Sequence, residues 1–435
     1  MTDAAASQCA PALALVVDAY GPGRWFPTYF ARHGIRCVHI QSTAQPLPAL
    51  TPVDLGAFHD HLVHAGSPHD TAERIRALAA QLQARIVCVI PGVEPGVELA
   101  DQLSELLGVV SNGTAGSPAR RNKFLMDAAL EAAGVPVPAF FKSADVEQLV
   151  AYAGSRAHWP LVLKPLDSAG SNGVFICDSV DDIRRAFAEN IGKTNNMGKV
   201  NREMLVQSFL DGPEYMVNTV SRDGRHYVSD IWHAKKIRLA GHGFIYDCNV
   251  LLDGADPVAL ALGRYAATVL DALAIRHGPA HAEIIMTGAG PVLVEVGARI
   301  SGLVDPAYND LLLEHNQIAL AVEAYAAPAM FAARPGGTYR RVLHGVQVCL
   351  ISAISGTVAA VPFKDALGDI ASLVGANLKI RPGSRVNTTI DLSSSTGVCN
   401  LAGPDAAALA RDVATIRARY AHGVELAPAL PAQAA

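Results

Sequence analysis

The sequence has little of what marks membrane, secreted or nucleic-acid-binding proteins. Lys and Arg (35) are fewer than Asp and Glu (40), the net charge is −5, and the basic residues form no long run. Such a balance provides no electrostatic footprint for nucleic acid or for an anionic membrane. The N-terminus lacks a positively charged segment, and its apolar run "PALALVV" is too short for a signal core or a membrane span. We therefore expect a cytoplasmic protein.

Metal-binding and redox patterns of cysteine are also missing. The seven cysteines include no C-x-x-C pair, and most lie in apolar, strand-like runs such as "RIVCVI", which predicts buried thiols in a reducing compartment. The stretch "FHDHLVHAGSPH" is rich in histidine but has no cysteine or paired carboxylates beside it, so we expect a surface loop and helix rather than a zinc site. Its histidines are His59, His61, His64 and His69.

The pattern of segments divides the 435 residues into three parts. Residues 1–115 alternate strand-like and helical segments, which predicts a parallel sheet with helices on its faces. Residues 116–330 contain strand pairs and tight turns around the helical "VALALGRYAATVLDAL". Residues 331–435 carry strand-like runs, "RRVLHGVQVCLIS" and "VNTTIDL", and the amphipathic "DAAALARDVATIRARY", which predict a small α+β unit. The expected fold class is α/β and α+β.

Two glutamates stand inside the strand-like runs of "HAEIIMTGAGPVLVEVGAR", residues 281–299. Runs rich in β-branched residues flank "TGAGP", which is turn chemistry, so the stretch predicts a hairpin. A turn centred on Ala289 would place both glutamates opposite each other on one face of the sheet. The pairs predicted by this register are Glu283 with Glu295, Ile285 with Leu293, and His281 with Gly297.

Facing glutamates inside a sheet need a positive partner. Like charges directly opposite each other destabilise a strand pair, and burying them unpaired costs more. A divalent hard cation would satisfy both, since Mg²⁺ is usually held by one or two carboxylates together with substrate phosphates. The alternative is a register slip of one residue, which would turn one glutamate toward solvent.

A lysine and a loop of small residues form a second motif in "PLVLKPLDSAGSNGVFICDS". The strand-like "LVLK" ends at Lys164 and runs into the loop, which leaves as a second strand, "VFIC". Small residues let backbone N–H groups approach an anion, and the lysine supplies a point charge. The strand–loop–strand context excludes a Walker A loop, which must open a helix. A plain flexible turn is the alternative to a phosphate-binding loop.

These motifs follow one another in a particular order. Lys123 at a helix start precedes Lys164 and its loop, then "LVQSFLDGPEYMV", and then the hairpin glutamates with Arg299 behind them. This order resembles the ATP-grasp superfamily, from about Ser117 to Arg299. "VEVGARISG" and "VLHGVQVCLIS" are most similar to the bacterial L-amino acid ligases, which are carboxylate–amine ligases that make dipeptides. The resemblance implies an ATP-grasp fold with a Rossmann-like N-terminal domain, a mobile flap at about 160–206, and a small C-terminal unit.

The resemblance also implies roles for individual residues. Lys164 and Arg299 match catalytic residues, of which the arginine steadies the acyl phosphate and the tetrahedral intermediate. Glu283 and Glu295 match the metal ligands. The implied ATP-binding residues are Lys123, Lys164, Ser168, Gly170, Ser171 and Gly173 at the phosphates, Gln207, Phe209 and Leu210 at the adenine, and Glu214 at the ribose.

The implied activity is ATP-dependent formation of an amide bond between amino acids or similar substrates. A substrate carboxylate would attack the γ-phosphate, and an amine would displace phosphate from the acyl phosphate, leaving ADP and phosphate. The implied cofactors are ATP and Mg²⁺, for which Mn²⁺ could substitute. The implied partners are a small-molecule acid and amine, with a homodimer as the common assembly of similar enzymes. Gly297 stands where many members have a metal-binding Asn, which implies one firmly held ion and a second bound mainly by phosphate oxygens.

Substrate contacts are predicted between the flap and the hairpin and directly after it. For any one of these residues, an exposed charged turn is the alternative. Two other functions stay open: an ATP-grasp carboxylase or another acyl-phosphate-forming enzyme, and a non-catalytic nucleotide-binding protein, against which the complete set of lysines, glutamates and arginine argues. The candidates for substrate binding are His233, Lys236, Tyr246, Asp247, Arg299, Ser301 and Gly302, with Lys235 and Arg238 in the same polar stretch.

Overall fold

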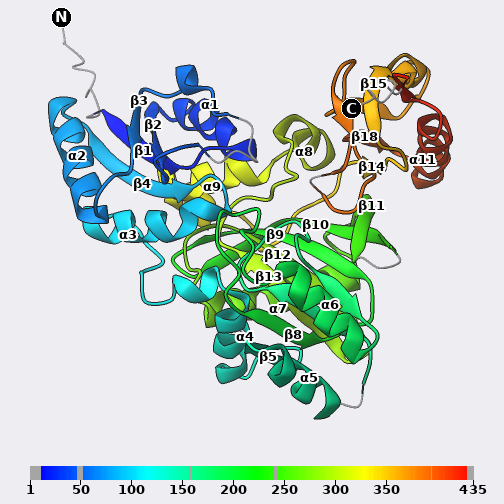
Figure 1. The fold of residues 1–435 in the computed structure, drawn as a ribbon. Coiled ribbons are helices and arrows are strands. Elements are labelled where there is room, and N and C mark those ends of the chain that lie inside the picture. The colour runs from blue at the N-terminus through cyan, green and yellow to red at the C-terminus, as the bar shows by residue number, and fades with distance from the viewer. Residues whose placement is uncertain (1–10, 47–51, 156–157, 240–242, 393, 429–435) are drawn as a thin grey trace, which may run out of the picture.

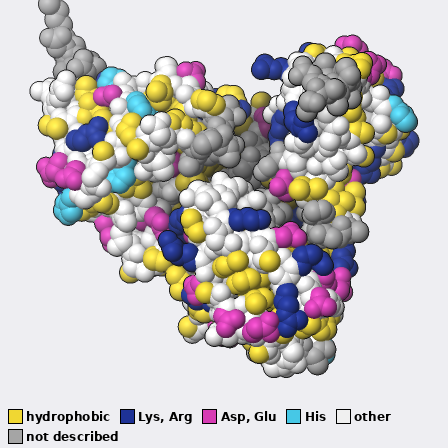
Figure 2. All heavy atoms as spheres, viewed as in Figure 1, with side chains coloured by type: hydrophobic (Ala, Val, Ile, Leu, Met, Phe, Trp, Pro, Cys, Tyr) yellow, Lys and Arg dark blue, Asp and Glu magenta, His cyan; other side chains and the backbone are white. Residues whose placement is uncertain are grey.

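The computed structural model describes residues 11–46, 52–155, 158–239, 243–392 and 394–428. An N-terminal lobe and a C-terminal lobe lie on opposite sides above a larger central part (Figure 1). On the face seen in Figure 2, Lys and Arg side chains are interspersed with Asp and Glu, as the nearly balanced charge of the sequence leads one to expect. Within the described part of the chain, no helix is both long and apolar enough to cross a membrane.

The N-terminal lobe contains the predicted parallel sheet, with strand order β3-β2-β1-β4. The central strand β1 is buried on both faces: Leu13 and Leu15 pack toward α2 and α3. Ala14 and Val16 pack toward α1 and toward α9, which comes from much later in the chain. The elements are β1 (Ala12–Val17), η1 (Gly21–Trp25), α1 (Phe26–Ala31), β2 (Ile35–Gln41), η2 (Leu55–Ala57), β3 (Asp60–Val63), α2 (Pro68–Gln81), β4 (Arg85–Pro91), η3 (Glu94–Gly96), α3 (Val97–Leu107) and α9 (Gln317–Ala326).

The histidine-rich stretch contains a strand that was not predicted. β3 pairs in parallel with β2, so His61 lies beside His39 with their Nδ1 atoms 3.0 Å apart. The expectation of a loop and helix is therefore wrong for His61, because the pairing partner is distant in sequence. His64 forms a hydrogen bond with Thr71 on α2, at 2.8 Å. Among the residues that the structure describes, no group of three or more His, Cys, Asp or Glu side chains is placed to hold a metal ion.

A four-stranded antiparallel sheet, order β5-β8-β6-β7, carries the glycine-containing loop between β6 and β7. α5 and α6 pack on this flap sheet around Leu149, Leu161 and Ile183. The predicted strand–loop–strand around Lys164 is confirmed. The elements are β5 (Phe140–Ser143), α5 (Val146–Ser155), β6 (Leu161–Pro165), β7 (Phe175–Cys177), α6 (Val180–Asn190) and β8 (Met204–Ser208).

The central sheet is the largest and has eight strands in the order β13-β12-β9-β10-β11-β14-β18-β16. α7 packs on it with Leu262 and Val269, which join Ile284 in the main core. β14, from beyond residue 331, pairs directly with β11, and β18 and β16 follow it, so the sheet continues across the expected domain boundary. The elements are β9 (Glu214–Arg222), β10 (Arg225–Arg238), β11 (Phe244–Leu251), α7 (Pro257–Ala272), β12 (Gly278–Thr287), β13 (Gly290–Gly297), β14 (His344–Leu350), β16 (Leu373–Leu378) and β18 (Gly397–Gly403).

The C-terminal lobe adds a small sheet of β17, β15 and β19, with α11 packed on β14 and β18. The expected strand "VNTTIDL" is wrong beyond Val386. There Ser394 Oγ accepts hydrogen bonds from the backbone N–H groups of Ile390 and Asp391, at 2.9 and 3.0 Å, and such local bonds compete with strand pairing. The elements are β15 (Gly356–Ala360), η5 (Pro362–Leu367), β17 (Arg385–Val386), α11 (Ala406–Tyr420) and β19 (Glu425–Leu426), with α8 (Pro306–Leu313) and α10 (Pro328–Ala332) preceding them.

Candidate active site

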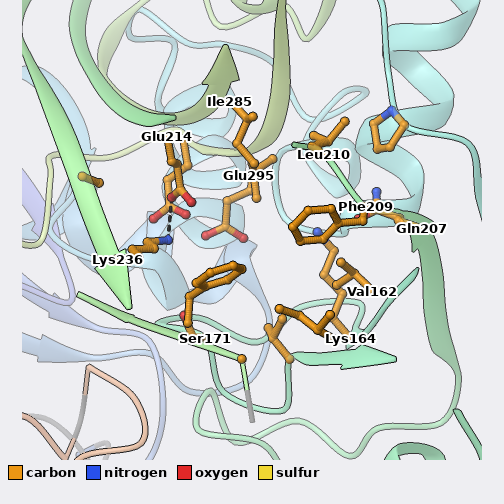
Figure 3. A pocket seen from close by; sticks show the side chains of 18 of the residues that line it. Val162, Lys164, Ser171, Gln207, Phe209, Leu210, Glu214, Lys236, Ile285 and Glu295 are labelled. Atoms are coloured by element: carbon orange, nitrogen blue, oxygen red, sulfur yellow. Dashed lines mark hydrogen bonds and ion pairs between the residues drawn. The ribbon is translucent and has the colours of Figure 1, made fainter. Parts of the chain in front are cut away.

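A cavity of about 500 Å³ lies between the flap sheet and the central sheet (Figure 3). Its wall is built from β6, β7 and β8 of the flap, from β9 to β13 of the central sheet, and from the loop between β6 and β7. Most of the residues predicted from the sequence meet here. Those in the cavity wall are Lys123, Lys164, Ser168, Gly170, Ser171, Gln207, Phe209, Leu210, Glu214, His233, Lys236, Glu283 and Glu295.

The hairpin of β12 and β13 brings two carboxylates together in the cavity wall. Glu283 and Glu295 lie directly opposite each other, and His281 lies opposite Gly297, as predicted. Both side chains are largely buried, with exposed fractions of 18% and 24%. The register that turns one glutamate toward solvent is therefore excluded.

Between the turn and the glutamates, the register differs from the prediction. The turn consists of two residues, Gly288 and Ala289, and Val294 is the extra residue of a β-bulge. The prediction assumed a turn centred on one residue and no bulge, and the two errors cancel at the glutamates. The observed pairs are Ile285 with Val292 and Ile284 with Leu293, in place of the predicted Ile285 with Leu293.

Two lysines approach the carboxylates from other elements. Lys123 is the first residue of α4 (Lys123–Ala132), directly after the N-cap residue Asn122. The short helix η4 (Pro118–Arg120) and Arg121 precede that cap. Its Nζ lies 2.6 Å from Glu295 Oε2 and donates to the carbonyl oxygen of Ser168 at 2.8 Å. Lys164, near the end of β6, is buried. Burial and the charge of Lys123 lower the pKa of Lys164 to about 8, against the opposing effect of nearby carboxylates.

A third carboxylate shares the cavity. Glu214, the first residue of β9, has Oε1 2.6 Å from Lys236 Nζ on β10 (Figure 3). The Tyr246 hydroxyl donates to Glu283 at 3.1 Å, and Lys236 Nζ lies 4.3 Å from the centre of the tyrosine ring. Burial alone would raise the pKa of Glu283, but Lys236 and neighbouring donors outweigh it and hold the pKa well below its usual range. Burial raises the pKa of Glu214, with Lys236 opposing and the other glutamates reinforcing the rise.

The other side of the cavity is apolar and has a polar edge. Val162, Phe209 and Ile285 lie along it, and Gln207 stands at its rim (Figure 3). The Gln207 amide nitrogen donates to the carboxylate of Asp127 on α4, and both side chains are buried. Burial raises the pKa of Asp127 to about 7. An apolar slot with a few polar groups at its rim suits a flat heterocycle such as adenine.

The loop between β6 and β7 contributes backbone and small side chains to the cavity. Ser168, Gly170 and Ser171 line it, but Gly173 does not. Gly173 has φ of +72°, and a Cβ there would collide with Asn190 Oδ1, so this glycine serves the turn rather than the cavity surface.

An asparagine holds this loop in place. The Asn196 side chain donates to the Ala169 carbonyl oxygen at 2.7 Å, and its Oδ1 accepts from the Ala169 N–H at 3.3 Å. These two hydrogen bonds connect the loop between β6 and β7, the candidate for phosphate binding, to the segment that follows α6.

Arg299 lies beside the carboxylates, in the wall of a small adjoining cavity. Its Nε is 2.8 Å from Glu94 Oε2, while Arg121 Nη1 is 2.6 Å from Glu94 Oε1. Burial alone would raise the pKa of Glu94, but Arg299 and Arg121 outweigh it and lower the pKa below its usual value. Glu94 belongs to η3 in the N-terminal lobe, and its carboxylate occupies the space of a side chain at position 297. A Cβ on Gly297 would lie 2.5 Å from Glu94 Oε2.

Three further residues of the site, Glu94, Arg121 and Asp127, are not marked by any of the sequence motifs. Their partners are far away in the chain, so no local motif marks them. One signal was available for Glu94, which follows the carboxyl end of β4, where open parallel sheets bind ligands. Arg121 stands two residues before Lys123, and its proximity to the helix start could have suggested an anion site.

Five predicted substrate residues lie outside the wall of the main cavity. Two of them stay close to it: Tyr246 is buried and donates to Glu283, and Arg299 lines the adjoining small cavity. The other three are Asp247, Ser301 and Gly302.

Asp247 is the extra residue of a β-bulge in β11, and its side chain pairs with Arg417 of α11 instead of entering the cavity. Ser301 is buried, and its backbone N–H donates to a glutamine side chain at 2.8 Å. Gly302 does not line the cavity either. The polar stretch of β10 divides similarly: Lys235 lines the cavity, whereas Arg238 pairs with Asp178 at 2.7 Å.

The charges that line the cavity suit a phosphate ligand with a cation. The opposing groups are four carboxylates and four ammonium groups: those of Asp211, Glu214, Glu283 and Glu295, and those of Lys123, Lys164, Lys235 and Lys236. These charges balance, so a nucleoside triphosphate would bring an excess of negative charge into a buried site. Two facing carboxylates supply the hard oxygen donors that a divalent cation such as Mg²⁺ prefers, and the lysines are suited to phosphate oxygens. The residues therefore fit both groups.

Comparisons with known proteins agree with this chemistry. The ATP-grasp domain family matches residues 157–306. The chain is 33% identical over 409 residues to dapdiamide A synthase of Enterobacter agglomerans, covering 93% of this chain and 94% of that protein. It is 26% identical over 246 residues to the L-arginine-specific L-amino acid ligase of Bacillus subtilis, covering 55% of this chain and 58% of that protein. The crystal structure of an L-amino acid ligase from Bacillus licheniformis has a TM-score of 0.74 at 17% identity, over 96% of this chain and 99% of that chain.

These relatives confirm the predicted ATP-grasp fold and the predicted reaction class, ATP-dependent formation of an amide bond. Members of the family use ATP and a divalent metal ion. Similarity to the synthase extends over nearly the whole chain, including the lobes on both sides of the matched domain. The chain belongs to the ATP-grasp superfamily, among its carbon–nitrogen ligases.

Proposed function

We propose that this ligase joins two amino acids, or an amino-acid-like acid and amine, through an acyl phosphate. The observation that carries the proposal is the meeting of the Glu283–Glu295 pair with Lys123 and Lys164 in one cavity, with Arg299 beside them. The relatives support amino acids as substrates, because two of them are named L-amino acid ligases. The products would be an amide, ADP and phosphate.

The ATP site would occupy the cavity between the two sheets. Lys123 and Lys164 would bind phosphate oxygens, together with N–H groups of the loop that carries Ser168, Gly170 and Ser171. The slot beneath Phe209 and Leu210 would hold the adenine, with Gln207 at its edge, and Glu214 would accept hydrogen bonds from the ribose. Glu214 is bound to Lys236 at 2.6 Å, so the ribose would share it with that lysine.

Glu283 and Glu295 would hold the divalent ion, which we propose to be Mg²⁺, with Mn²⁺ as a substitute. When bound, the ion would neutralise charge on the transferring phosphoryl group. Lys123, now paired with Glu295, would turn toward the phosphates as the carboxylate turns toward the ion. Because Gly297 offers no ligand, a second ion would depend mainly on phosphate oxygens.

In the first step, a carboxylate oxygen of the acid attacks the γ-phosphorus, the bond to the β-phosphate oxygen breaks, and ADP leaves. Lys164 and the loop N–H groups stabilise the charge on the transferring group. In the second step, the amine nitrogen attacks the acyl carbon, loses a proton, and phosphate leaves. Arg299 stabilises the oxyanion of this step. The loop over the phosphates excludes water, which would hydrolyse the acyl phosphate.

A phosphate-release screen with ATP, Mg²⁺ and pairs of amino acids tests the proposal, followed by mass spectrometry of the products. We expect release that requires both an acid and an amine, with a product of the amide mass. Release with bicarbonate alone would indicate a carboxylase instead. A lack of ATP turnover with every pair would contradict the proposed reaction. The same assay on Glu295→Ala tests the proposed metal ligand. Its control is Glu147→Ala, because Glu147 is an exposed glutamate that pairs with Arg184 on the flap surface.

We further propose a homodimer in a reducing compartment such as the cytoplasm. The described cysteines are buried and unbridged, which supports the compartment; Cys9 lies outside the described residues. The resemblance to similar enzymes supports the dimer. Sedimentation velocity of the purified chain tests it, and a single species of monomer mass would contradict it.

A further inference from the structure

A buried hydrogen bond joins β8 of the flap sheet to helix α4 beside the apolar part of the cavity. Gln207 on β8 lines the cavity, and its side-chain amide nitrogen donates to the carboxylate of Asp127 on α4. Asp127 does not line the cavity itself, so it stands behind Gln207. The exposed fractions of the two residues are only 4% and 2%. A carboxylate buried this deeply is costly, so its position needs a reason.

This hydrogen bond fixes which way the Gln207 amide faces. A glutamine side chain can present an NH₂ group that donates or a carbonyl oxygen that accepts, whereas an ionised carboxylate can only accept. Asp127 therefore holds the NH₂ group, and the carbonyl oxygen of Gln207 is the atom left for a ligand in the cavity. Burial raises the pKa of Asp127 to about 7, against the opposing effect of Lys164, so the carboxylate is mostly ionised at pH 8.

The pairing of the flap strands determines where this oxygen stands. Gln207 lies opposite Val162 of β6, and both side chains line the cavity. Lys164 comes two residues after Val162 and therefore faces the same side of β6. A nucleotide with its phosphates at Lys164 would thus have its base beside Val162, with Gln207 at the edge of the base.

We propose that Asp127 is a positioning residue that makes the site selective for adenine, because it keeps the Gln207 carbonyl oxygen turned toward the base. The inference rests on the proposed placement of adenine beside Gln207. The 6-amino group of adenine donates a hydrogen bond, which this oxygen can accept, whereas guanine and hypoxanthine carry the acceptor O6 at the same place. In the reverse orientation, the NH₂ group of Gln207 would favour O6 instead.

Calorimetry of nucleotide binding to the full chain tests the inference at pH 8 with Mg²⁺, and it does not require that the acid and the amine be known. The probes are ADP and inosine diphosphate, which has O6 in place of the 6-amino group. The unaltered protein should bind ADP more tightly. Asp127→Asn should lower the ratio of the two affinities by about tenfold or more, because an asparagine also donates and no longer fixes the Gln207 amide.

The ratio of affinities isolates the base from the phosphates. Asp127→Asn also removes a charge near Lys164, but both nucleotides share this effect on the phosphate site, so it cancels in the ratio. Glu131→Gln is the matched control, because it removes the same charge one turn further along α4, where the side chain is exposed. It should leave the ratio unchanged.

An exchange of the two groups separates positioning from a merely structural role. In a protein that carries both Asp127→Asn and Gln207→Glu, the asparagine can donate to the glutamate, whose carboxylate again presents an acceptor to the base. The ratio of affinities should therefore return toward that of the unaltered protein. A ratio that stays as low as in Asp127→Asn alone would contradict the positioning role.

Two further results would overturn the inference, and they differ in what else they affect. Circular dichroism verifies folding, and Asp127→Ser, which likewise cannot hold the amide in one orientation, replaces Asp127→Asn if that variant unfolds. An unchanged ratio in the folded Asp127 variant, with a lower ratio in Gln207→Leu, would reject the role of Asp127 alone. An unchanged ratio in Gln207→Leu as well would also reject the proposed placement of adenine.

Discussion

Replacing Gly297 by alanine should damage the enzyme although it adds a single methyl group. The Cβ would lie 2.5 Å from Glu94 Oε2, and ordinary contact begins at 3.4 Å, so the carboxylate would have to move by about 0.9 Å. Such a carboxylate would normally move easily at the end of a flexible side chain. Here it is buried and held at 2.8 Å by Arg299 and at 2.6 Å by Arg121.

The magnitude follows from the ion pair that this movement lengthens. Moving the Glu94 carboxylate from 2.8 Å to about 3.7 Å from Arg299 would weaken their attraction by about 1.4 kcal/mol at an effective dielectric constant of about 20, and would destabilise the fold by about that amount. If Arg299 shifts with the carboxylate, the same energy lost in the transition state corresponds to a decrease of about tenfold in kcat for amide formation. ATP binding should change less, because Gly297 lines the small adjoining cavity and not the wall of the larger cavity that would hold ATP.

Urea unfolding and coupled phosphate release measure the two effects. Gly288→Ala, at the tip of the same hairpin, is the control, because a Cβ there meets nothing within 4 Å. Equal stability and equal kcat in Gly297→Ala and the control would refute the reasoning. It would mean that Glu94 moves freely and does not hold Arg299.

Three further predictions concern the proposed chemistry. Glu295→Ala should lower metal-dependent ATP turnover by more than about 100-fold, because losing a residue that only supports a metal ligand already costs roughly 10- to 100-fold. The circular dichroism spectrum should stay unchanged, and full activity would contradict the metal assignment. Arg299→Ala should lower kcat for amide formation by about 100- to 1,000-fold, with little change in nucleotide affinity measured by calorimetry. Arg340→Ala, which removes an exposed ion-paired arginine, is the control. Equal losses in nucleotide affinity and rate would argue against an oxyanion role for Arg299. The pKa of Lys164 is lowered to about 8 by burial and by Lys123, so its charge is present below pH 8 and is lost as the pH rises. The kcat/KM for ATP should therefore fall by about tenfold per pH unit above 8, and Lys164→Arg should remove this fall; a pH profile shared by both proteins would exclude Lys164 as its origin.

Local patterns in the sequence determined the parts of the site that lie within one or two neighbouring segments. A lysine at the first position of α4, a lysine near the end of β6, and two glutamates on facing strands follow from helix starts, turn residues and strand alternation. Their order along the chain indicated the superfamily, and the comparisons bore this out. Alternation also determined that Glu283 and Glu295 face the same way, although the bulge between them and the turn could not be foreseen.

Contacts between distant segments were decided by the tertiary structure. Glu94 comes from the N-terminal lobe to hold Arg299, and Asp127 on α4 meets Gln207 on β8. The same holds for Asp247, which the pairing of the C-terminal lobe with β11 leaves facing α11 instead of the cavity. No residue-to-residue spacing encodes these contacts, because each depends on how lobes and sheets pack.

Charge inside the strands of the β12–β13 hairpin depends on both levels. The sequence by itself predicted a cation at the glutamate pair, and it showed that lysines and a small-residue loop were available for phosphates. Only the tertiary structure decided that the place of a side chain at Gly297 is taken by Glu94. Periodicity is a property of neighbours in the chain, whereas hydrogen bonds and ion pairs form between whatever groups the completed fold places within reach.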